Sequence, residues 1–396
     1  MDNGKCPVSK RCGGCRYLDV RYEKQLKDKL GRVRELLKNY GNVETIIGMD
    51  NPYHYRNKIN SAFAVRKKEG IVCGIYEEGT HNVIPMPENG CIIEDERAYP
   101  ILSTIKRLIS SFKIPIYNED TGYGLLRHVM IRTGRKTGQI MVVLVTADPV
   151  FPSKKNFTGA LLKEHKEITT IVQNINTKNT SMVLGDRNIV MYGKGYIEDV
   201  LCDKKFRISP NSFYQINPIQ TQRLYEKAVE LAGLTGKESV IDAYCGIGTI
   251  GMVASDKAKR VTGVELNKEA VRDAITNAKI NNCNNITFYN NDAGKFMSRL
   301  AMQRKAGDNR SGDKTDVVFM DPPRSGSTKE FMDSLLTLAP HRIVYISCNP
   351  ETLGRDLKYI LQKGQYVVKK MIAVDMFCWT EHVESVVLLS KTQDKS

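Results

Sequence analysis

The 396-residue chain lacks any apolar run near the length that a membrane-spanning helix requires, roughly 20 residues. Its first residues, MDNGKCPVSKRCGGC, also lack the apolar stretch of a secretory signal. We therefore expect a cytoplasmic protein with no membrane attachment. In that compartment the ten cysteines are not expected to form disulfides, so they are free thiols, metal ligands or nucleophiles.

Acidic residues are too few to balance the basic ones. The chain has 44 Asp and Glu against 59 Lys and Arg, which gives a formal net charge of +15. Such a balance favours a polyanionic partner such as a nucleic acid, although a solvated lysine-rich surface would give the same total. The length exceeds that of one ordinary domain and predicts two or three.

Three regions differ in their pattern of apolar residues. Residues 1–51 hold clustered cysteines and an amphipathic helix predicted over 21–39. Residues 52–205 show short alternating segments between Gly, Asn and Asp turns, which predicts a central α+β domain with an antiparallel sheet. Residues 206–396 begin with a polar aromatic loop and a helix predicted near 218–231, and then alternate short β-branched strands with helices. This last pattern predicts a Rossmann-like α/β domain with a mostly parallel sheet.

A glycine-rich loop, DAYCGIGTIG, follows the first strand of the third region and precedes a helix. Gly246, Gly248 and Gly251 satisfy the dinucleotide fingerprint, and Glu265 lies about 20 residues further on. The glycines could bring the backbone close to a pyrophosphate, as in an NAD-dependent oxidoreductase. They could equally bring it close to the amino-acid end of S-adenosylmethionine, with Glu265 accepting hydrogen bonds from the ribose hydroxyls. The loop alone does not decide.

Two later strand ends favour the second interpretation. The third strand ends at Asp292, placed for an adenine edge, and the fourth ends at Asp321, which two prolines follow. Ligands of open α/β sheets bind beside the carboxyl ends of the strands. A rigid Asp-Pro-Pro turn there is typical of methyltransferases that act on planar nitrogenous groups, although it is also a good strand-ending turn. We therefore predict S-adenosylmethionine as the cofactor.

Cys348 stands at the tip of the fifth strand, in IVYISCNPETL. Carbon 5 of uracil is not nucleophilic enough to take a methyl group directly, but a thiolate added to carbon 6 turns carbon 5 into an enolate-like nucleophile. Such a cysteine needs thiolate character and hence an electropositive setting, such as the helix start at Pro350. Glu384, just before the last strand, is the candidate base for the carbon 5 proton. A lone cysteine is more often a small buried hydrophobe, but Asp321, Cys348 and Glu384 all fall at strand edges around one crevice.

At these residues the sequence resembles the RNA uracil-5-methyltransferases, which form 5-methyluridine in transfer and ribosomal RNA. The motifs FYQIN, YCGIGTIG, DPPRSG, SCNPETLGRD and HVESV occur in the family's order along most of the chain. The resemblance implies that Cys348 is the nucleophile and Glu384 the proton acceptor. Together with the glycine loop and Asp292, it gives a predicted set of cofactor-binding residues: Gln215, Tyr244, Gly246, Gly248, Glu265, Asp292 and Asp321.

Two features depart from the family pattern. Cys378 stands where members usually have a proline in the final motif, so we expect an altered loop shape with unchanged chemistry. Many members begin with a small RNA-binding β-barrel, for which we expect no room in this chain. This second departure leaves open which RNA is the substrate.

The N-terminal cysteines suggest a metal site. Cys6, Cys12 and Cys15 form a C-x5-C-x2-C pattern, and a four-thiolate site needs one more ligand, with Cys91 as the first candidate and Cys73 as the second. The spacing suits zinc and an iron–sulfur cluster equally. The resemblance implies a [4Fe–4S] cluster, because ribosomal members carry one at this pattern with a distant fourth cysteine. We expect a largely structural role that ties the N-terminus to the central sheet.

Through this cysteine pattern the resemblance also implies a loop of 23S ribosomal RNA as the partner. We expect a monomeric enzyme that takes the target uridine out of its stack. Aromatic and basic residues interleave in NPYHYRNK and GYGLLRHVMIR, as in surfaces that bind single-stranded RNA. Phe213 or Tyr214 could support the target nucleotide, although each of these stretches could equally be the edge of a core.

Several other functions stay open on the sequence. The chain could methylate uridine in transfer RNA instead. It could methylate an amino group of adenine or glutamine, which would leave Cys348 and Glu384 without a role. A third possibility is an iron–sulfur RNA-binding protein whose methyltransferase domain is inactive.

Overall fold

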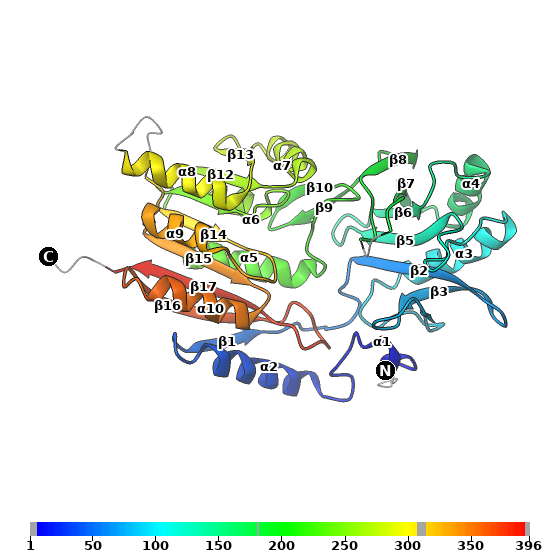
Figure 1. Ribbon diagram of the computed structural model, residues 1–396, viewed down its shortest axis with the longest axis horizontal. Coiled ribbons are helices and arrows are strands. Elements are labelled where there is room, and N and C mark those ends of the chain that lie inside the picture. The colour runs from blue at the N-terminus through cyan, green and yellow to red at the C-terminus, as the bar shows by residue number, and fades with distance from the viewer. Residues whose placement is uncertain (1–5, 180–181, 307–313, 393–396) are drawn as a thin grey trace.

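The structure is a computed structural model that describes residues 6–179, 182–306 and 314–392. Two lobes lie side by side in Figure 1, one around a seven-stranded sheet and the other around an eight-stranded sheet. Between them lies a hairpin of β9 (Ile197–Leu201) and β10 (Lys204–Ile208). Its two turn residues, Cys202 and Asp203, both have positive φ, as a two-residue hairpin turn requires.

The first lobe follows the alternating apolar pattern of residues 52–205. Its sheet has the order β4-β3-β2-β5-β6-β7-β8 and is antiparallel in every pairing except β6 with β7. The helix α4 makes this exception possible, because parallel neighbours need a crossover connection. The elements are β2 (Lys58–Arg66), β3 (Gly70–Tyr76), β4 (Val83–Pro85), α3 (Ala98–Ser111), β5 (Leu126–Thr133), β6 (Ile140–Thr146), α4 (Lys154–Glu164), β7 (Ile168–Ile175) and β8 (Arg187–Tyr192).

Strand β6 shows how this lobe divides its core. Val142 and Leu144 pack with α3 and α4, whereas Met141 and Val143 pack on the opposite face. Side chains of a strand alternate between the two faces of the sheet, so one strand contributes to both cores. The second face joins an apolar cluster that continues through the hairpin to Leu224 of the other lobe. The two lobes therefore share a hydrophobic core.

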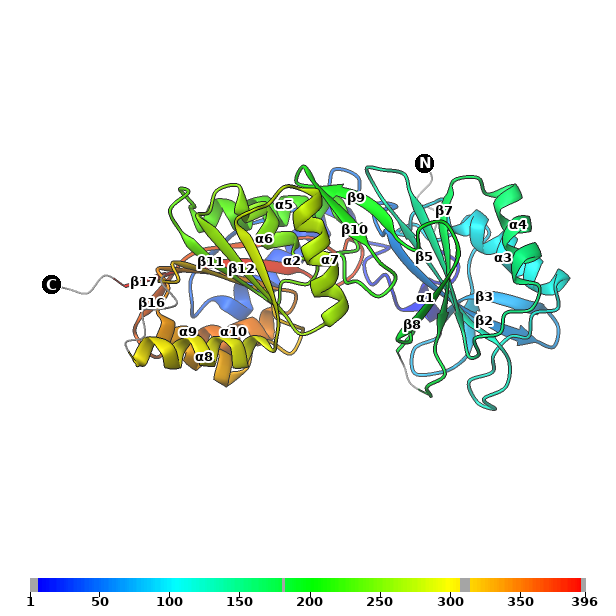
Figure 2. The same cartoon turned by 90° about the horizontal axis from the view of Figure 1, so that it is seen from above.

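The second lobe contains the predicted Rossmann-like sheet, in the order β1-β16-β17-β15-β14-β11-β12-β13. Figure 2 shows α5, α6 and α7 on one side of this sheet and α8, α9 and α10 on the other. The helices predicted over 21–39 and near 218–231 are present as α2 and α5. The elements are α2 (Tyr22–Leu37), β1 (Val43–Ile47), α5 (Pro218–Ala232), β11 (Ser239–Ala243), α6 (Thr249–Ser255), β12 (Arg260–Glu265), α7 (Lys268–Ile280), β13 (Ile286–Asn290), α8 (Ala293–Lys305), β14 (Val317–Met320), α9 (Lys329–Leu338), β15 (Arg342–Ser347), α10 (Pro350–Leu361), β16 (Tyr366–Val374) and β17 (Glu384–Lys391).

Helix α2 and strand β1 of the N-terminal segment pack on this second lobe. Strand β1 pairs with β16 in parallel, and α2 lies against α10. The buried Lys29 ammonium contacts the buried Asp375 carboxylate at 2.5 Å, and the Tyr22 hydroxyl donates to the same carboxylate at 2.8 Å. These contacts fix α2 to the loop that follows β16. The predicted division of the chain at residues 51 and 205 stays a prediction.

One strand runs against the others and completes the edge where the candidate residues gather. Strand β17 is antiparallel to both β15 and β16, while the neighbouring pairs from β15 to β13 are all parallel. The carboxyl ends of β11 to β16 therefore lie at the same edge as the start of β17. We call this the strand-end edge. No helix in the described ranges is long and apolar enough to cross a membrane.

Candidate active site at the strand-end edge

The glycine loop after β11 leaves open backbone at the strand-end edge. Gly246 and Gly248 have φ of +56° and +84°, a region that side-chain-bearing residues rarely adopt. A Cβ atom on Gly248 would stand 2.8 Å from the Phe288 ring, so only glycine fits there. Around Gly246, by contrast, a Cβ would meet no described atom within 4 Å. The loop is therefore closely packed at Gly248 and leaves free space at Gly246.

Two carboxylates hold this loop. Glu265 accepts hydrogen bonds from the backbone N–H groups of Gly246 at 3.0 Å and Asn267 at 2.7 Å. Asp242 accepts from the N–H of Gly251 at 2.7 Å through Oδ2, while its buried Oδ1 has no partner among the described residues. Burial raises the pKa of Asp242 to about 8. Asp242 is a site residue that was not predicted, although its place at the head of DAYCGIGTIG was the available signal.

Tyr244 and Asp292 line the next part of the edge. Tyr244 has φ of +66°, stacks on Phe331 with ring centroids 5.4 Å apart, and has its hydroxyl 3.4 Å from that of Ser327. Asp292 caps α8 by accepting a hydrogen bond from the Lys295 N–H at 3.0 Å. Burial raises the pKa of Tyr244, and the nearby Asp292 charge adds to this effect. The structure therefore brings these two predicted residues together.

Gln215 reaches the same edge through a residue that sequence reasoning missed. Its side chain lies near enough to the Tyr225 hydroxyl to lower the pKa of that group slightly, and the Thr249 hydroxyl donates to the same oxygen at 3.3 Å. Tyr225 is buried on α5 and close enough to Asp321 for that carboxylate to raise its pKa, after the larger effect of burial. Because Tyr225 falls on the apolar face of a predicted helix, its position along the chain does not distinguish it from a core residue.

Cys348 and Glu384 face each other across two antiparallel strands. Ser347 at the end of β15 pairs with Ser385 of β17, so the next residues along this register are Cys348 and Glu384. Residues directly opposite in antiparallel strands have Cα atoms about 4.5–5.5 Å apart. Glu384 is buried, and Cys348 is half-buried at the strand tip. Among the described residues the Glu384 carboxyl group has no hydrogen-bond partner.

The charges of this site act on one another. Burial raises the pKa of Glu384 to about 8, with a further contribution from Asp321 and an opposing one from Arg324. Burial raises the pKa of Asp321 to about 7. It also raises the pKa of the Cys348 thiol to about 11, and Glu384 and Asp321 add to this shift while Arg324 opposes it. The three predicted groups therefore share one site, and Arg324 is its opposing positive charge.

This balance corrects one expectation. The sequence predicts an electropositive setting for Cys348, and the predicted helix start is present, with α10 beginning at Pro350. Burial nevertheless raises the pKa of the Cys348 thiol to about 11, and Glu384 and Asp321 raise it further against the single opposing charge of Arg324. The setting is thus less electropositive than predicted, because sequence separation hid both the burial of this strand tip and the approach of the two carboxyl groups. Arg324, although present in the motif DPPRSG, received no role in the sequence analysis.

One cysteine of the N-terminal motif, Cys15, lies near Cys91. Charge on Cys12 or Cys6 raises the pKa of Cys15, and charge on Cys15 raises the pKa of Cys91. Cys73, the second candidate, lies on β3 and is coupled to none of these thiols. Burial raises the pKa of both Cys15 and Cys91 to about 12. Within the described ranges, no three His, Cys, Asp or Glu side chains converge closely enough to hold a single metal ion.

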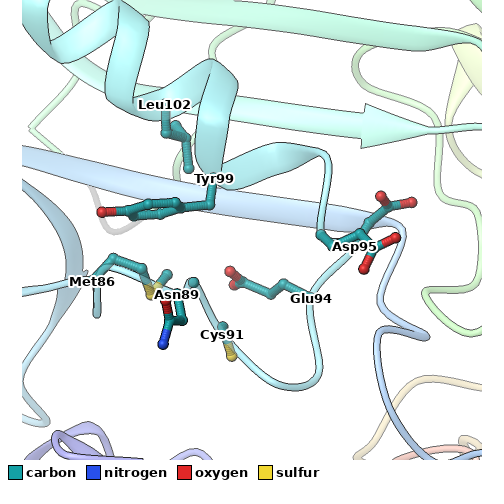
Figure 3. A pocket seen from close by; sticks show the side chains of 9 residues that line it. Met86, Asn89, Cys91, Glu94, Asp95, Tyr99 and Leu102 are labelled. Atoms are coloured by element: carbon teal, nitrogen blue, oxygen red, sulfur yellow. The ribbon is translucent and has the colours of Figure 1, made fainter.

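A pocket of the first lobe borders these cysteines and is separate from the strand-end edge. Cys91, Glu94 and Tyr99 are among the residues that line it, and the Cys91 sulfur points away from the Tyr99 ring (Figure 3). Burial raises the pKa of Glu94 to about 7. An apolar cluster around Cys378 and Trp379 packs against Cys15 and Cys91 from the other side. The cysteine motif therefore contacts the loop that leads to Glu384.

A family model described as tRNA (uracil-5-)-methyltransferase matches residues 157–392. The chain belongs to this family. It is 42% identical over 389 residues to an uncharacterised RNA methyltransferase of Halalkalibacterium halodurans, a match that covers 97% of this chain and 82% of that protein. An uncharacterised RNA methyltransferase of Clostridium tetani is 41% identical over 395 residues, covering 98% and 83%.

A solved structure supports the same assignment. The Pyrococcus abyssi tRNA (uracil-54, C5)-methyltransferase, in complex with S-adenosyl-L-homocysteine, superposes with a TM-score of 0.78. The two sequences are 28% identical, and the match covers 95% of this chain and 85% of the other. The predicted Rossmann-like fold of class I methyltransferases is therefore confirmed.

The buried Glu384 carboxyl predicts a pH-dependent effect on stability. Its pKa of about 8 exceeds the value of about 4.3 for an unfolded glutamate, so the folded state binds the proton more tightly between these values. The stability that this group contributes is largest at low pH and is lost as the pH rises towards 8. Since glutamine cannot ionise, we expect Glu384→Gln to be more stable than the wild type by about 1–3 kcal/mol near pH 9 and nearly equal near pH 5.

Urea unfolding at the two pH values measures this difference. Glu381→Gln, at an exposed position three residues away, is the control and should show no such trend. An equal stability difference for Glu384→Gln at both pH values would contradict the assigned burial of the charge.

Proposed function

We propose that the protein transfers a methyl group from S-adenosylmethionine to carbon 5 of a uridine in RNA, through a transient bond between Cys348 and carbon 6. The observation that carries this proposal is the register of β15 and β17, which sets Cys348 opposite Glu384. Family membership supports uracil as the methylated base. The S-adenosyl-L-homocysteine bound to the Pyrococcus abyssi relative supports the cofactor.

The residues at the strand-end edge fit this cofactor. When bound, S-adenosylmethionine supplies a methyl group on a positively charged sulfonium. The open space at Gly246 lets the backbone approach the amino-acid end. The unpartnered Oδ1 of Asp242 lies behind the loop, and a cationic group such as the methionyl ammonium would favour the ionised form of this carboxyl. Glu265 lies at the end of β12, where a ribose would be bound, and Tyr244 and Asp292 lie beside it towards the adenine.

The chemistry uses the facing pair in two stages. After the Cys348 thiol loses its proton to solvent, the sulfur adds to carbon 6 of the uracil, and the electron pair of the ring double bond moves to carbon 5. Carbon 5 then forms a bond to the methyl group, whose bond to the sulfonium sulfur would break and release S-adenosylhomocysteine. Glu384 next takes the proton from carbon 5. The electrons of that carbon–hydrogen bond restore the double bond and expel the Cys348 thiolate. The pKa of Glu384, about 8, is close to neutral pH, so this group can both accept a proton and release it.

Arg324 has a supporting role in this account. It is the cation that lowers the pKa of both Cys348 and Glu384, so it favours the thiolate that attacks and the carboxylate that accepts the proton. Asp321 opposes it by raising both values. A positively charged ligand beside Asp321 would offset that effect, because its own charge lowers the pKa of a nearby thiol or carboxyl group.

The RNA partner is supported by charge and by exposed aromatic residues. The net charge of +15 suits a polyanion, and Phe213 is 65% exposed on the loop that also carries Gln215. We propose a loop of 23S ribosomal RNA as the substrate, as the cysteine pattern predicts. Transfer RNA is the second candidate, favoured by the similarity to the Pyrococcus abyssi enzyme.

Replacement of the nucleophile tests the mechanism. We expect Cys348→Ala to lower the rate of 5-methyluridine formation by about 10³-fold or more, because the covalent step has no substitute. Cys283→Ala, at a half-buried cysteine outside the site, should retain full activity. The product is measured by mass spectrometry of nucleosides from unmodified 23S and transfer RNA transcripts. Undiminished 5-methyluridine from Cys348→Ala would refute the mechanism, and the transcript that the wild type methylates identifies the class of RNA.

We also propose that Cys6, Cys12, Cys15 and Cys91 hold a [4Fe–4S] cluster. The four thiols are electrostatic neighbours, and a cluster would bind them as thiolates on four separate irons, farther apart than the ligands of one ion. The cluster would tie the N-terminal segment to the first lobe. Its neighbour Trp379 donates from its ring nitrogen to the Pro52 carbonyl at 2.8 Å.

Metal analysis of anaerobically purified protein tests this site. We expect about four iron atoms per chain together with visible absorbance, and the loss of both in Cys91→Ser. Cys73→Ser is the matched control, since Cys73 is a half-buried cysteine of the first lobe whose pKa none of the four proposed ligands shifts. Zinc in place of iron, or unchanged iron in Cys91→Ser, would contradict the assignment.

A further inference from the structure

The loop of residues 322–327 joins β14 to α9 and carries Arg324 to the strand-end edge. Arg324 is exposed, and its side chain forms no hydrogen bond or ion pair with a described residue. The position of its guanidinium group relative to Cys348 and Glu384 therefore depends on the backbone of this loop. We call residues 322–327 the arginine loop.

Helix α10 begins two residues after Cys348 and binds the arginine loop at its N-terminal end. Asn349, the N-cap residue, donates from Nδ2 to the Arg324 carbonyl at 3.3 Å. The Thr352 hydroxyl lies 3.2 Å from the same carbonyl. Because Asn349 directly follows Cys348 in the chain, these contacts hold the backbone of Arg324 beside the residue that carries the sulfur.

Asp356 and Arg355, further along α10, hold the other end of the arginine loop. Asp356 accepts hydrogen bonds from the Ser327 N–H at 2.7 Å, and from Nη2 and Nε of Arg355 at 2.7 and 2.9 Å. The Nη2 atom of Arg355 also donates to the carbonyls of Ser325 at 2.9 Å and Ser327 at 3.3 Å. Consecutive residues of a helix do not face each other, so the convergence of these two side chains on one loop is a specific arrangement. We call Asp356 and Arg355 the loop clamp.

The loop clamp packs tightly against the backbone that it holds. Gly326 has φ of +79°, and a Cβ atom on it would stand 2.5 Å from Nη2 of Arg355 and 2.7 Å from Oδ2 of Asp356. Asp356 is 0% exposed, and the Tyr345 hydroxyl of β15 donates to it at 2.6 Å. A buried carboxylate loses its hydration and needs hydrogen bonds or an opposite charge in compensation. Asp356 has both, so the clamp fixes one position of the loop.

Charged groups from two elements face the Cys348 thiol. Asp321 and Arg324 follow β14, and Glu384 is the first residue of β17. Besides burial, the two carboxyl groups raise the pKa of the thiol and Arg324 lowers it. Burial and the charge of Arg324 also lower the pKa of the nearby His382, so this ring is neutral near pH 7. The position of Arg324 therefore decides how much positive charge the sulfur meets.

We propose that Asp356 is a positioning residue that keeps the Arg324 guanidinium group beside Cys348. It acts through Arg355 and the arginine loop, and the inference rests on the proposed function. It gives a role to the last two residues of SCNPETLGRD, a motif of which that function uses only the cysteine. Without the loop clamp the arginine loop keeps only its contacts with the start of α10, so the guanidinium group moves. The attacking thiolate then loses the positive charge that favours it.

Alkylation of Cys348 tests this role without RNA or cofactor. The full-length protein reacts with iodoacetamide at pH 8, and peptide mass spectrometry gives the rate at Cys348. We expect Arg324→Met and Asp356→Asn each to lower this rate by about 3- to 10-fold, because a rise of one unit in the thiol pKa lowers the thiolate fraction tenfold. A direct effect of the lost Asp356 charge has the opposite sign, since removing a negative charge favours a thiolate. A wild-type or higher rate in Asp356→Asn would overturn the inference.

The double variant shows whether Asp356 acts through Arg324. Arg324→Met combined with Asp356→Asn should react no more slowly than Arg324→Met alone, because an absent arginine cannot be displaced. Two effects that multiply in the double variant would contradict the proposal. Asp333→Asn is the matched control, since Asp333 of α9 also accepts from a tyrosine, Tyr359 of α10, at a site outside the arginine loop. It should react at the wild-type rate, and an equal loss there would contradict the proposal too.

A second variant covers the case in which Asp356→Asn fails to fold. Gly326→Ala changes no charge but forces the arginine loop away from the loop clamp, so it should slow the alkylation of Cys348 in the same way. Alkylation of Gly326→Ala at the wild-type rate would refute the positioning role. Failure of the proposed function gives a different result. A wild-type protein that methylates neither transcript refutes that function, whereas one that methylates RNA while Asp356→Asn keeps the wild-type alkylation rate refutes only the role of Asp356.

Discussion

The antiparallel insertion of β17 between two strands that run the other way is the constraint on which this site depends. In a wholly parallel sheet the start of the last strand would lie at the opposite edge from Cys348. Here β17 is reversed, and the pairing of Ser347 with Ser385 brings Glu384 across from the sulfur. The reversal is also what places the loop after β16 at the strand-end edge. The facing pair is therefore a consequence of sheet topology, and no single side-chain contact creates it.

A buried ion pair fixes the loop that joins β16 to β17. Lys29 of α2 reaches Asp375 at the end of β16, and Tyr22 binds the same carboxylate. Removing one partner of such a pair leaves a buried charge without compensation, which is strongly destabilising. The N-terminal helix is thus part of the support for Glu384. The cysteine motif extends this support, because its apolar neighbours include Trp379 in the same loop.

The site itself is energetically unfavourable in the free protein. Asp242, Asp321 and Glu384 are all carboxyl groups whose pKa burial raises to about 7 or 8. Groups in this range change charge near neutrality, which is useful for binding a cation and for moving a proton. Their loss of solvation is the corresponding cost in stability. A fold optimised only for stability would not gather three such groups at one edge.

Much of this arrangement follows from the sequence, because each candidate residue ends a strand in a pattern of alternating strands and helices. The glycine loop, Asp321 and Cys348 could be placed at one edge by that pattern alone. Three features could not. The parallel pairing of β1 with β16 joins residues far apart in the chain. Tyr225 has the burial and helical spacing of a core residue. The electrostatic balance at Cys348 depends on approaches across the sheet that no local pattern encodes.

The most direct test of the central claim is to look for the bond between sulfur and RNA. In Glu384→Gln, addition and methyl transfer can proceed but the carbon 5 proton cannot be removed, so the protein should remain attached to its RNA under denaturing conditions. Peptide mass spectrometry after nuclease digestion should then find a methylated uridine nucleotide on Cys348. A denaturation-resistant adduct on a different cysteine, or full turnover by Glu384→Gln with no adduct, would contradict the account.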